Sequence, residues 1–288
     1  MKIAHAPSQL DRQPRAVAIG AFDGVHRGHR SVIQTALDTG LAATVVTFDP
    51  HPRIAFGHRV ELITTLERKL ELFGEAGAES ALIVSFTPEV MRLEPEVFAE
   101  EYLRAIGAEV VVAGGDFRFG RGRSGDLELL ERLGFEVRTA PEVPGVSSSA
   151  IRTLVEEGDV AGAAALLGRP PELDGIVVPG ERRGGTLGYP TANLGVDSSL
   201  LVPRFGIYAG AALGHRAALS IGTNPHYGGT ERRIEPYLLD FEGDLYGQRL
   251  VVEVWQRLRD ELAFPSEEAL IEQIARDVEA TREAVRPV

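Results

Sequence analysis

A short apolar run at residues 16–19 (AVAI) leads directly into the sequence GAFDGVHRGHR at residues 20–30, and this junction restricts the folds open to the chain. The apolar run is typical of a buried strand. Gly20 and Gly24 permit a tight exit from that strand, and the polar residues that follow predict the start of a helix. The chain is therefore expected to open with a strand–turn–helix unit.

His26 and His29 lie three residues apart at the start of the predicted helix. This spacing places both on one face, beside backbone N–H groups that have no partner within the helix. The pair predicts a site for anionic oxygens, where the helix N-terminus and imidazole N–H groups could hold a triphosphate. Two alternatives stay open on the residues alone. One is a zinc site, although the chain has no cysteine and no evident third ligand; the other is a pair of surface histidines without a function.

Strand and helix patterns alternate through the first half of the chain. This order calls for a parallel sheet with right-handed crossovers, whose ligands bind beyond the carboxyl ends of the strands. We expect a Rossmann-like α/β domain over residues 1–167. Its strands are predicted at residues 16–19, 41–48, 81–86, 110–113 and 136–139, and its helices at residues 31–37, 66–73, 96–106, 127–133, 150–156 and 160–167.

Three loops at that edge of the sheet contain residues suited to a nucleotide and a flat ring. They are residues 47–52 (TFDPHP), 113–125 (AGGDFRFGRGRSG) and 145–152 (GVSSSAIR). Glycine lets the backbone approach a ligand, arginine can clamp phosphate, and phenylalanine can stack on a ring. The alternatives are a proline-rich turn, a solvated loop and serines that act only as helix N-caps.

The character of the chain changes near residue 168, where we place the boundary of a second domain, residues 168–288. Short strands with glycine turns predict an antiparallel β-barrel or sandwich. Strands are expected at residues 175–178, 205–213, 217–222, 234–239 and 250–257. A terminal helix over residues 266–285 has one apolar stripe, formed by Leu270, Ile274 and Val278.

A glycine-rich loop at residues 180–193 (GERRGGTLGYPTAN) stands out in this second domain. A glycine loop alone is more often a barrel turn than a phosphate site. Thr191 and Asn193 strengthen the functional interpretation, because hydroxyl and amide oxygens suit a Mg²⁺ ion that bridges ATP phosphates.

Composition excludes several classes of protein. The formal net charge of −12 argues against a general nucleic-acid binder. No apolar run is long enough for a membrane span, and the N-terminus lacks a signal-peptide pattern, so a cytoplasmic protein is expected. Only Lys2 and Lys69 are lysines, and neither lies in a glycine-rich loop, which excludes a Walker-type phosphate loop.

These motifs resemble, in chain order, those of the bacterial bifunctional riboflavin kinase/FMN adenylyltransferase (FAD synthetase) family. Residues 20–29 are similar to the HxGH signature of nucleotidylyltransferases in the family's GxFDGVH form. Residues 47–52, 113–125 and 145–152 resemble its TFxPHP, GxDFRFG and SSTxIR segments. Residues 190–193 (PTAN) match the riboflavin kinase signature, and residues 235–241 resemble its VExxLLDF segment.

The resemblance implies two reactions. The barrel domain would phosphorylate riboflavin with ATP and Mg²⁺ to give FMN, with Glu235 as general base. The α/β domain would adenylylate FMN with a second ATP, giving FAD and pyrophosphate, with His26, His29 and Arg152 as its catalytic residues. The implied contacts in the adenylyltransferase are Gly20, Phe22, Asp23, His26, His29, Ser148 and Arg152 for ATP and Phe48, His51, Asp116, Phe117 and Arg118 for flavin; those in the kinase are Gly180, Gly184, Gly188, Thr191 and Asn193 for nucleotide, with Thr191 and Asn193 also holding the metal.

Two other functions remain alternatives: a flavin-binding or sensing protein without catalysis, and an adenylyltransferase for another phosphorylated acceptor. Intact His26, His29, Thr191, Asn193 and Glu235 favour catalysis, and the PTAN segment is unexplained by the second alternative. The expected partners are riboflavin, FMN and ATP, with no nucleic acid and no membrane. The oligomeric state is left open.

Overall fold

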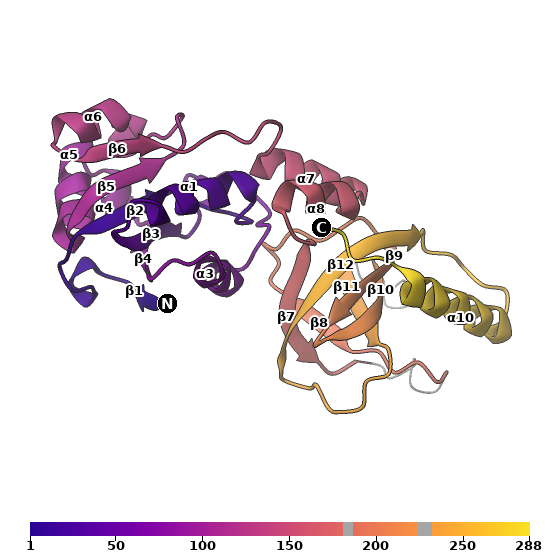
Figure 1. Ribbon diagram of the computed structural model, residues 1–288. Helices are drawn as coiled ribbons and strands as arrows, with labels where there is room; N and C mark the ends of the chain where they lie inside the picture. Colours follow the sequence, from indigo (N-terminus) through magenta and orange to yellow (C-terminus); the bar gives the residue numbers. More distant parts are fainter. Residues whose placement is uncertain (181–186, 224–231) are drawn as a thin grey trace. The chain divides into compact units, whose positions relative to one another are not determined.

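The computed structural model describes residues 1–180, 187–223 and 232–288 (Figure 1). Contacts divide the chain into two compact units. The first comprises residues 1–60 and 66–146, and the second comprises residues 61–65 and 147–288. This division falls upstream of the domain boundary that we place at residue 168. That boundary groups Ser148 and Arg152 with the motifs of the first half, and it remains a prediction.

The first unit is built on a six-stranded parallel sheet with the order β1-β4-β3-β2-β5-β6. The fold class predicted from the alternating pattern is confirmed. β1 was not predicted, because three residues are too few for a periodic pattern; it pairs with β4 at the sheet edge. The strands are β1 (Lys2–Ala4), β2 (Arg15–Ile19), β3 (Ala42–Asp49), β4 (Ser80–Ser85), β5 (Ala108–Ala113) and β6 (Glu136–Thr139).

Alternate residues of β2 show that both faces of this sheet are covered. Val17 and Ile19 pack in one apolar cluster, and Ala16 and Ala18 pack in another. Such strands are apolar on both faces, as parallel sheets require. The helical segments are α1 (Arg27–Leu37), α2 (Pro52–Ala55), α3 (Leu66–Glu75), α4 (Pro88–Met91), α5 (Pro95–Phe98) with a continuation to Ile106 in π and 3₁₀ geometry, and α6 (Leu127–Arg132).

The second unit is a nearly closed antiparallel barrel with the strand order β11-β10-β9-β12-β7-β8. β8 and β11, at the two ends of this order, pack against each other. β8 was not predicted, since its four residues include a glycine. The elements are α7 (Ser148–Glu157), α8 (Val160–Leu167), β7 (Glu172–Val178), β8 (Asn193–Val196), β9 (Gly206–Ala212), β10 (His215–Thr223), β11 (Arg232–Leu238), β12 (Arg249–Arg259) and α10 (Glu267–Glu283).

Residues 61–65 leave the first half of the chain and pack in the second unit. The Leu62 amide donates to the Ser199 carbonyl (2.6 Å), and the Leu201 amide donates to the Leu62 carbonyl (2.8 Å). Ile63 is buried in the apolar cluster that α7 and α8 form. The Thr65 hydroxyl donates to the carboxylate of Asp174. This segment is therefore part of the second unit's core.

Candidate active sites

The loop between β2 and α1 follows an unusual backbone path. Phe22, Gly24 and Val25 all have positive φ, at 53°, 82° and 40°. A backbone conformation with positive φ is strained for any residue except glycine. Gly20 is needed for a different reason, because a Cβ there would lie 3.2 Å from the Phe22 ring. The loop thus turns tightly over a buried phenylalanine and delivers the chain to the start of α1.

The structure brings the two histidines together at that helix start. His26 is the N-cap of α1, and its Nδ1 accepts a hydrogen bond from the backbone N–H of His29 (3.2 Å). The two imidazole rings stack with centroids 3.5 Å apart and planes 15° apart. The Phe22 ring meets His29 edge-on at 5.2 Å. The histidine ring orientations are thereby fixed by stacking and by the cap.

The surroundings of His29 favour its neutral form. Burial lowers the pKa of the His29 imidazole well below its usual range, and the nearby His26, Lys69 and His51 lower it further. Its Nδ1 is enclosed and has no hydrogen-bonding partner in the described structure. A neutral imidazole has one N–H donor and one acceptor nitrogen. Such a group can donate to a phosphate oxygen without exchanging a proton near neutral pH.

Other predicted residues lie in the β3–α2 region. Phe48 is 8% exposed and packs in the core against Phe86 and Phe98. His51 is the N-cap of α2, and its Nδ1 accepts from the Arg53 backbone N–H (3.2 Å). Phe56, which the sequence analysis did not single out, is 53% exposed and packs edge-on against Phe86. Its signal in the sequence was an aromatic residue shortly after the TFDPHP loop.

In the loop after β5, two phenylalanine rings stack and the polar side chains next to them are exposed. Phe117 stacks on the buried Phe119, with centroids 5.6 Å apart and planes 14° apart. Asp116 and Arg118 are exposed, and the Arg118 guanidinium donates to the Phe117 carbonyl (2.8 Å). Asp23, from the β2–α1 loop of the same unit, is 3% exposed.

The predicted residues of α7 belong to the second unit, whereas the histidine pair belongs to the first. Ser147 is the N-cap and accepts from the Ala150 N–H, so Ser148 is the first helical residue. We expected the helix to begin at residue 150; the serine cap starts it two residues earlier. Arg152 donates from Nε to the Glu61 carbonyl (2.7 Å).

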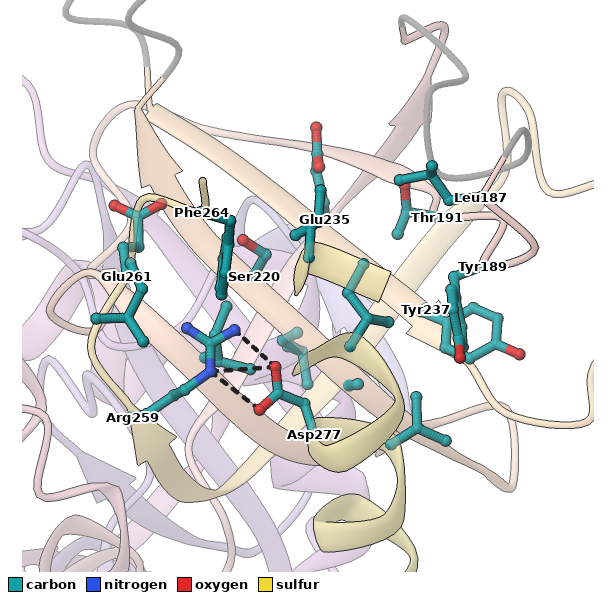
Figure 2. A pocket seen from close by; sticks show the side chains of 17 residues that line it. Leu187, Tyr189, Thr191, Ser220, Glu235, Tyr237, Arg259, Glu261, Phe264 and Asp277 are labelled. Atoms are coloured by element: carbon teal, nitrogen blue, oxygen red, sulfur yellow. Dashed lines mark hydrogen bonds and ion pairs between the residues drawn. The ribbon is translucent and has the colours of Figure 1, made fainter. Parts of the chain in front are cut away.

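A pocket of about 430 Å³ opens beside the barrel and the terminal helix (Figure 2). The apolar stripe predicted for that helix lines it, through Leu270, Ile274 and Val278. Arg259 and Asp277 form an ion pair at its wall, with Nη2 and Oδ2 2.6 Å apart. The remaining lining residues are Leu187, Tyr189, Thr191, Ile207, Ala218, Leu219, Ser220, Glu235, Tyr237, Glu261, Leu262 and Phe264.

Glu235 presents its carboxylate in this pocket from β11. It pairs with Ser220 of β10 in the ladder, and Arg233 lies 3.7 Å from its Oε1. Its side chain is 30% exposed, so solvent and ligand can both reach it. In Figure 2 Glu235 and Thr191 lie on the same side of the pocket, away from the Arg259–Asp277 pair.

A second pocket of about 210 Å³ adjoins the first, and Thr191 lines both. Pro190 and Ala192, the neighbours of Thr191, line only the second pocket. The PTAN segment therefore separates a larger, mostly apolar pocket from a smaller one. The rest of the smaller pocket is formed by Val177, Pro236, Leu238, Phe241, Gly243, Asp244, Leu245 and Tyr246.

Gly180 and Asn193 lie side by side at the ends of β7 and β8. A Cβ at position 180 would overlap with the Asn193 amide group, so only glycine leaves room for that side chain. Gly188 has a φ of 85°, which also favours glycine. Gly184 lies outside the described residues. The Thr191 hydroxyl and the Asn193 amide oxygen, two residues apart, are hard oxygen donors that suit Mg²⁺.

The described ranges lack both a metal cluster of these ligand types and a membrane-spanning helix. Residues 1–180, 187–223 and 232–288 contain no group of three or more His, Cys, Asp or Glu side chains arranged to hold a metal ion. Nor do those ranges contain a helix long and apolar enough to cross a bilayer.

The first unit has a parallel sheet with a histidine pair at a helix N-terminus. The second unit has an antiparallel barrel with two pockets that meet at a threonine. Together these features are those of a two-domain protein of the nucleotidyltransferase-plus-kinase class. Family models agree with this class: FAD synthetase matches residues 8–152, and riboflavin kinase matches residues 167–285. The chain belongs to the bifunctional riboflavin kinase/FMN adenylyltransferase family.

Similar proteins support that assignment. The bifunctional riboflavin kinase/FMN adenylyltransferase of Listeria monocytogenes is 36% identical over 93% of this chain and 91% of its own length. The protein of that name from Bacillus subtilis is 35% identical over 99% of this chain and 98% of its own. A solved structure described as a macrolide-efflux protein from Streptococcus pneumoniae superposes with a TM-score of 0.87 at 30% identity, covering 98% of this chain and 99% of that one.

Proposed function

We propose that the second unit phosphorylates riboflavin in the pocket that Glu235 lines, and that the histidine pair of the first unit serves the adenylylation of the resulting FMN. The chain is an enzyme of flavin cofactor biosynthesis with both activities. The observation that supports the placement of the kinase reaction is the position of Thr191 between two pockets, one of which contains a carboxylate.

The larger pocket suits riboflavin and the smaller one suits ATP. Aromatic and aliphatic side chains of the barrel and α10 would cover the flat ring, since apolar burial with a few polar groups is usual for such ligands. The ribityl chain would extend toward Glu235 and Thr191. The smaller pocket, with the PTAN backbone at its edge, would hold the nucleotide with its γ-phosphoryl group at Thr191.

In this arrangement the ribityl 5′-hydroxyl attacks the γ-phosphorus. The bond to the β,γ-bridging oxygen breaks, ADP leaves, and the hydroxyl proton passes to Glu235. A carboxylate within hydrogen-bonding reach suffices for this role, because phosphoryl transfer depends mainly on positioning and charge stabilisation. Thr191 and Asn193 would hold Mg²⁺, which neutralises the phosphate charge when bound. Gly180 leaves the space that Asn193 needs.

In the first unit the FMN phosphate attacks the α-phosphorus of ATP and pyrophosphate leaves. The attacking phosphate is already ionised, so no protein base is needed. His26 and His29 would donate hydrogen bonds to ATP phosphates from the start of α1, where backbone N–H groups add to the anion site. Arg152 and Ser148 belong to the second unit, and their contact with this nucleotide stays a prediction from the motif of residues 145–152. Phe56 and Phe117, with exposed ring surface, would contact the flavin ring together with His51.

The test is a time course of flavins, separated by chromatography, after mixing the protein with riboflavin, ATP and Mg²⁺. FMN should form first and convert to FAD. His29→Ala should reduce FAD formation and leave FMN formation at the wild-type rate; equal loss of both activities would refute the division between the two units. Tight flavin binding without turnover would favour the flavin-sensing alternative.

A further inference from the structure

Lys69 is one of the two lysines of the chain, and it is buried beside the histidine pair. It lies on α3 and is 7% exposed. Its Nζ donates to the Ala21 carbonyl and to the Thr47 hydroxyl, both at 3.3 Å. The Thr47 hydroxyl in turn donates to the Ala21 carbonyl at 3.2 Å. Lys69 thus joins the loop after β2 to the end of β3.

A buried ammonium is costly, because leaving water disfavours the charged form. Burial lowers the pKa of Lys69, and the carboxylates of Asp23 and Asp49 act in the opposite direction. Both hydrogen-bonding partners named above are neutral oxygens. An apolar side chain of equal length would fill the same space without this cost. A buried charge of this kind next to a candidate site points to a role in that site.

We propose that Lys69 is a positioning residue for adenylyl transfer, which clamps the Ala21 carbonyl and the Thr47 hydroxyl and so holds the loop that leads to His26 and His29. This inference rests on the adenylylation proposed above for the first unit. The loop needs such a clamp because Phe22 and Val25 are held at positive φ, a conformation that side-chain-bearing residues keep only when their surroundings impose it.

Lys69 also supplies fixed positive charge at this end of the sheet. Burial is the largest cause that lowers the pKa of the His29 imidazole, and Lys69 is one of three neighbours, with His26 and His51, that lower this pKa further. Phosphate oxygens placed at the start of α1 would therefore meet neutral N–H donors backed by a buried ammonium. Preorganised charge of this kind acts strongly where water is excluded.

The central variant is Lys69→Met, which keeps the length of the side chain and removes its charge and donors. We expect kcat for FAD formation from FMN to fall about 10- to 100-fold, the effect of a small misplacement of catalytic groups. The rate of FMN formation from riboflavin should not change. Lys69→Arg, which keeps the charge and N–H donors, should restore part of the lost kcat. Lys2→Met removes the other, exposed lysine and should match wild type in both reactions.

The pH profile distinguishes positioning from a purely structural role. Without the Lys69 charge, the pKa of His29 should rise, because the remaining causes of its depression are burial, His26 and His51. The acidic limb of the FAD-forming profile should then move to higher pH in Lys69→Met and not in Lys69→Arg. A variant that is only less stable would keep the wild-type profile below its melting temperature.

Thr47→Val gives a second, independent measurement, since it removes one acceptor of Lys69 from a fully buried position. It should lower kcat for FAD formation in the wild-type background and have no further effect in Lys69→Met. If Lys69→Met does not fold, Thr47→Val decides: an unchanged kcat overturns the inference. Wild-type kcat and pH profile in a folded Lys69→Met variant also overturn it. If the wild-type protein itself forms no FAD from FMN, the proposed function fails instead.

Discussion

The Nε of Arg152 donates a hydrogen bond of 2.7 Å to the carbonyl oxygen of Glu61, which precedes it by 91 residues. This contact fixes one end of the segment 61–65 against α7. Thr65 and its hydrogen bond to Asp174 fix the other end. Asp174 is itself buried and accepts two hydrogen bonds of 2.8 Å from Arg249. A five-residue piece of the N-terminal half is thereby built into the unit that contains the barrel.

Replacing Ile63 in that segment should destabilise the second unit. Ile63 is 5% exposed and packs with Ile151, Val155 and Leu167. Ile63→Ala should lower the free energy of unfolding by about 2–4 kcal/mol, the usual cost of a large-to-small change in a core. Urea unfolding followed by the fluorescence of Trp255, the one tryptophan of the chain, measures it in this unit. Ile176→Ala, at a 45% exposed position of β7, is the control and should cost less than about 1 kcal/mol. Equal effects would mean that the segment is not part of the core.

Glu235→Gln should separate the two activities. The amide keeps the size of the side chain but cannot accept the riboflavin 5′-hydroxyl proton. FMN formation should fall by about 10²- to 10⁴-fold, the usual contribution of a general base, while FAD formation from added FMN keeps its rate. Glu242→Gln, an exposed glutamate between β11 and β12, is the matched control. A Glu235→Gln variant with full kinase activity would remove Glu235 from the mechanism.

Gly180→Ala should weaken the kinase through Asn193. The added Cβ would displace the Asn193 amide group, and with it the proposed oxygen donor to Mg²⁺. We expect a higher Mg²⁺ requirement and a lower rate of FMN formation, with FAD formation from FMN unchanged. Gly74→Ala is the control, since a Cβ there meets only Met1 at 3.7 Å. Titration of both activities with Mg²⁺ provides the measurement, and an unchanged Mg²⁺ dependence in Gly180→Ala would contradict the assignment.

The neutral His29 predicts a pH dependence of stability. Its pKa is depressed in the folded chain, so as the pH falls through about 6.5 the unfolded chain takes up a proton that the folded chain does not. The free energy of unfolding should therefore decrease with falling pH, by up to about 1.4 kcal/mol per pH unit for this one proton. The measurement is urea unfolding by circular dichroism at pH 7.5 and 5.5. His29→Gln should lose part of this decrease, and His58→Gln, at an exposed position, is the control. The same decrease in both variants would show that His29 is not the group responsible.

Sequence reasoning located most elements because their patterns are local. The predicted strand at 136–139 matches β6, and the helix predicted at 160–167 matches α8. It missed β1, whose three residues are too few for a period to appear, and β8, whose four residues include a glycine. It also treated residues 96–106 as one helix, whereas the chain passes there from α5 into π and 3₁₀ turns. Hydrogen-bonding pattern within a helix depends on packing, which residue periodicity does not record.

For the candidate sites too, local signals in the sequence predicted where residues lie, and tertiary packing decided their surroundings. The HxGH residues were placed correctly at a helix start, because glycines, an N-cap and a following apolar pattern are local signals. Phe48, which we expected at the flavin site, is 8% exposed and packs in the core, and its contact with flavin stays a prediction. The exposed Phe56 nearby was overlooked. Lys69 was noted only as one of two lysines; its burial beside the histidines depends on how α3 packs on the sheet.

By itself, then, the sequence determined the class of each half and the order of its motifs, since residue type and short-range spacing are sufficient for those. It also led to the roles that we propose for Thr191, Asn193, Glu235 and the histidine pair. Only the tertiary structure decided that residues 61–65 belong with the barrel, that Thr191 lies between two pockets and that Lys69 is buried under the β2–α1 loop. Such relationships join residues far apart in the chain, and they form only when strands pair and helices pack, because burial and long-range hydrogen bonds are properties of the assembled core.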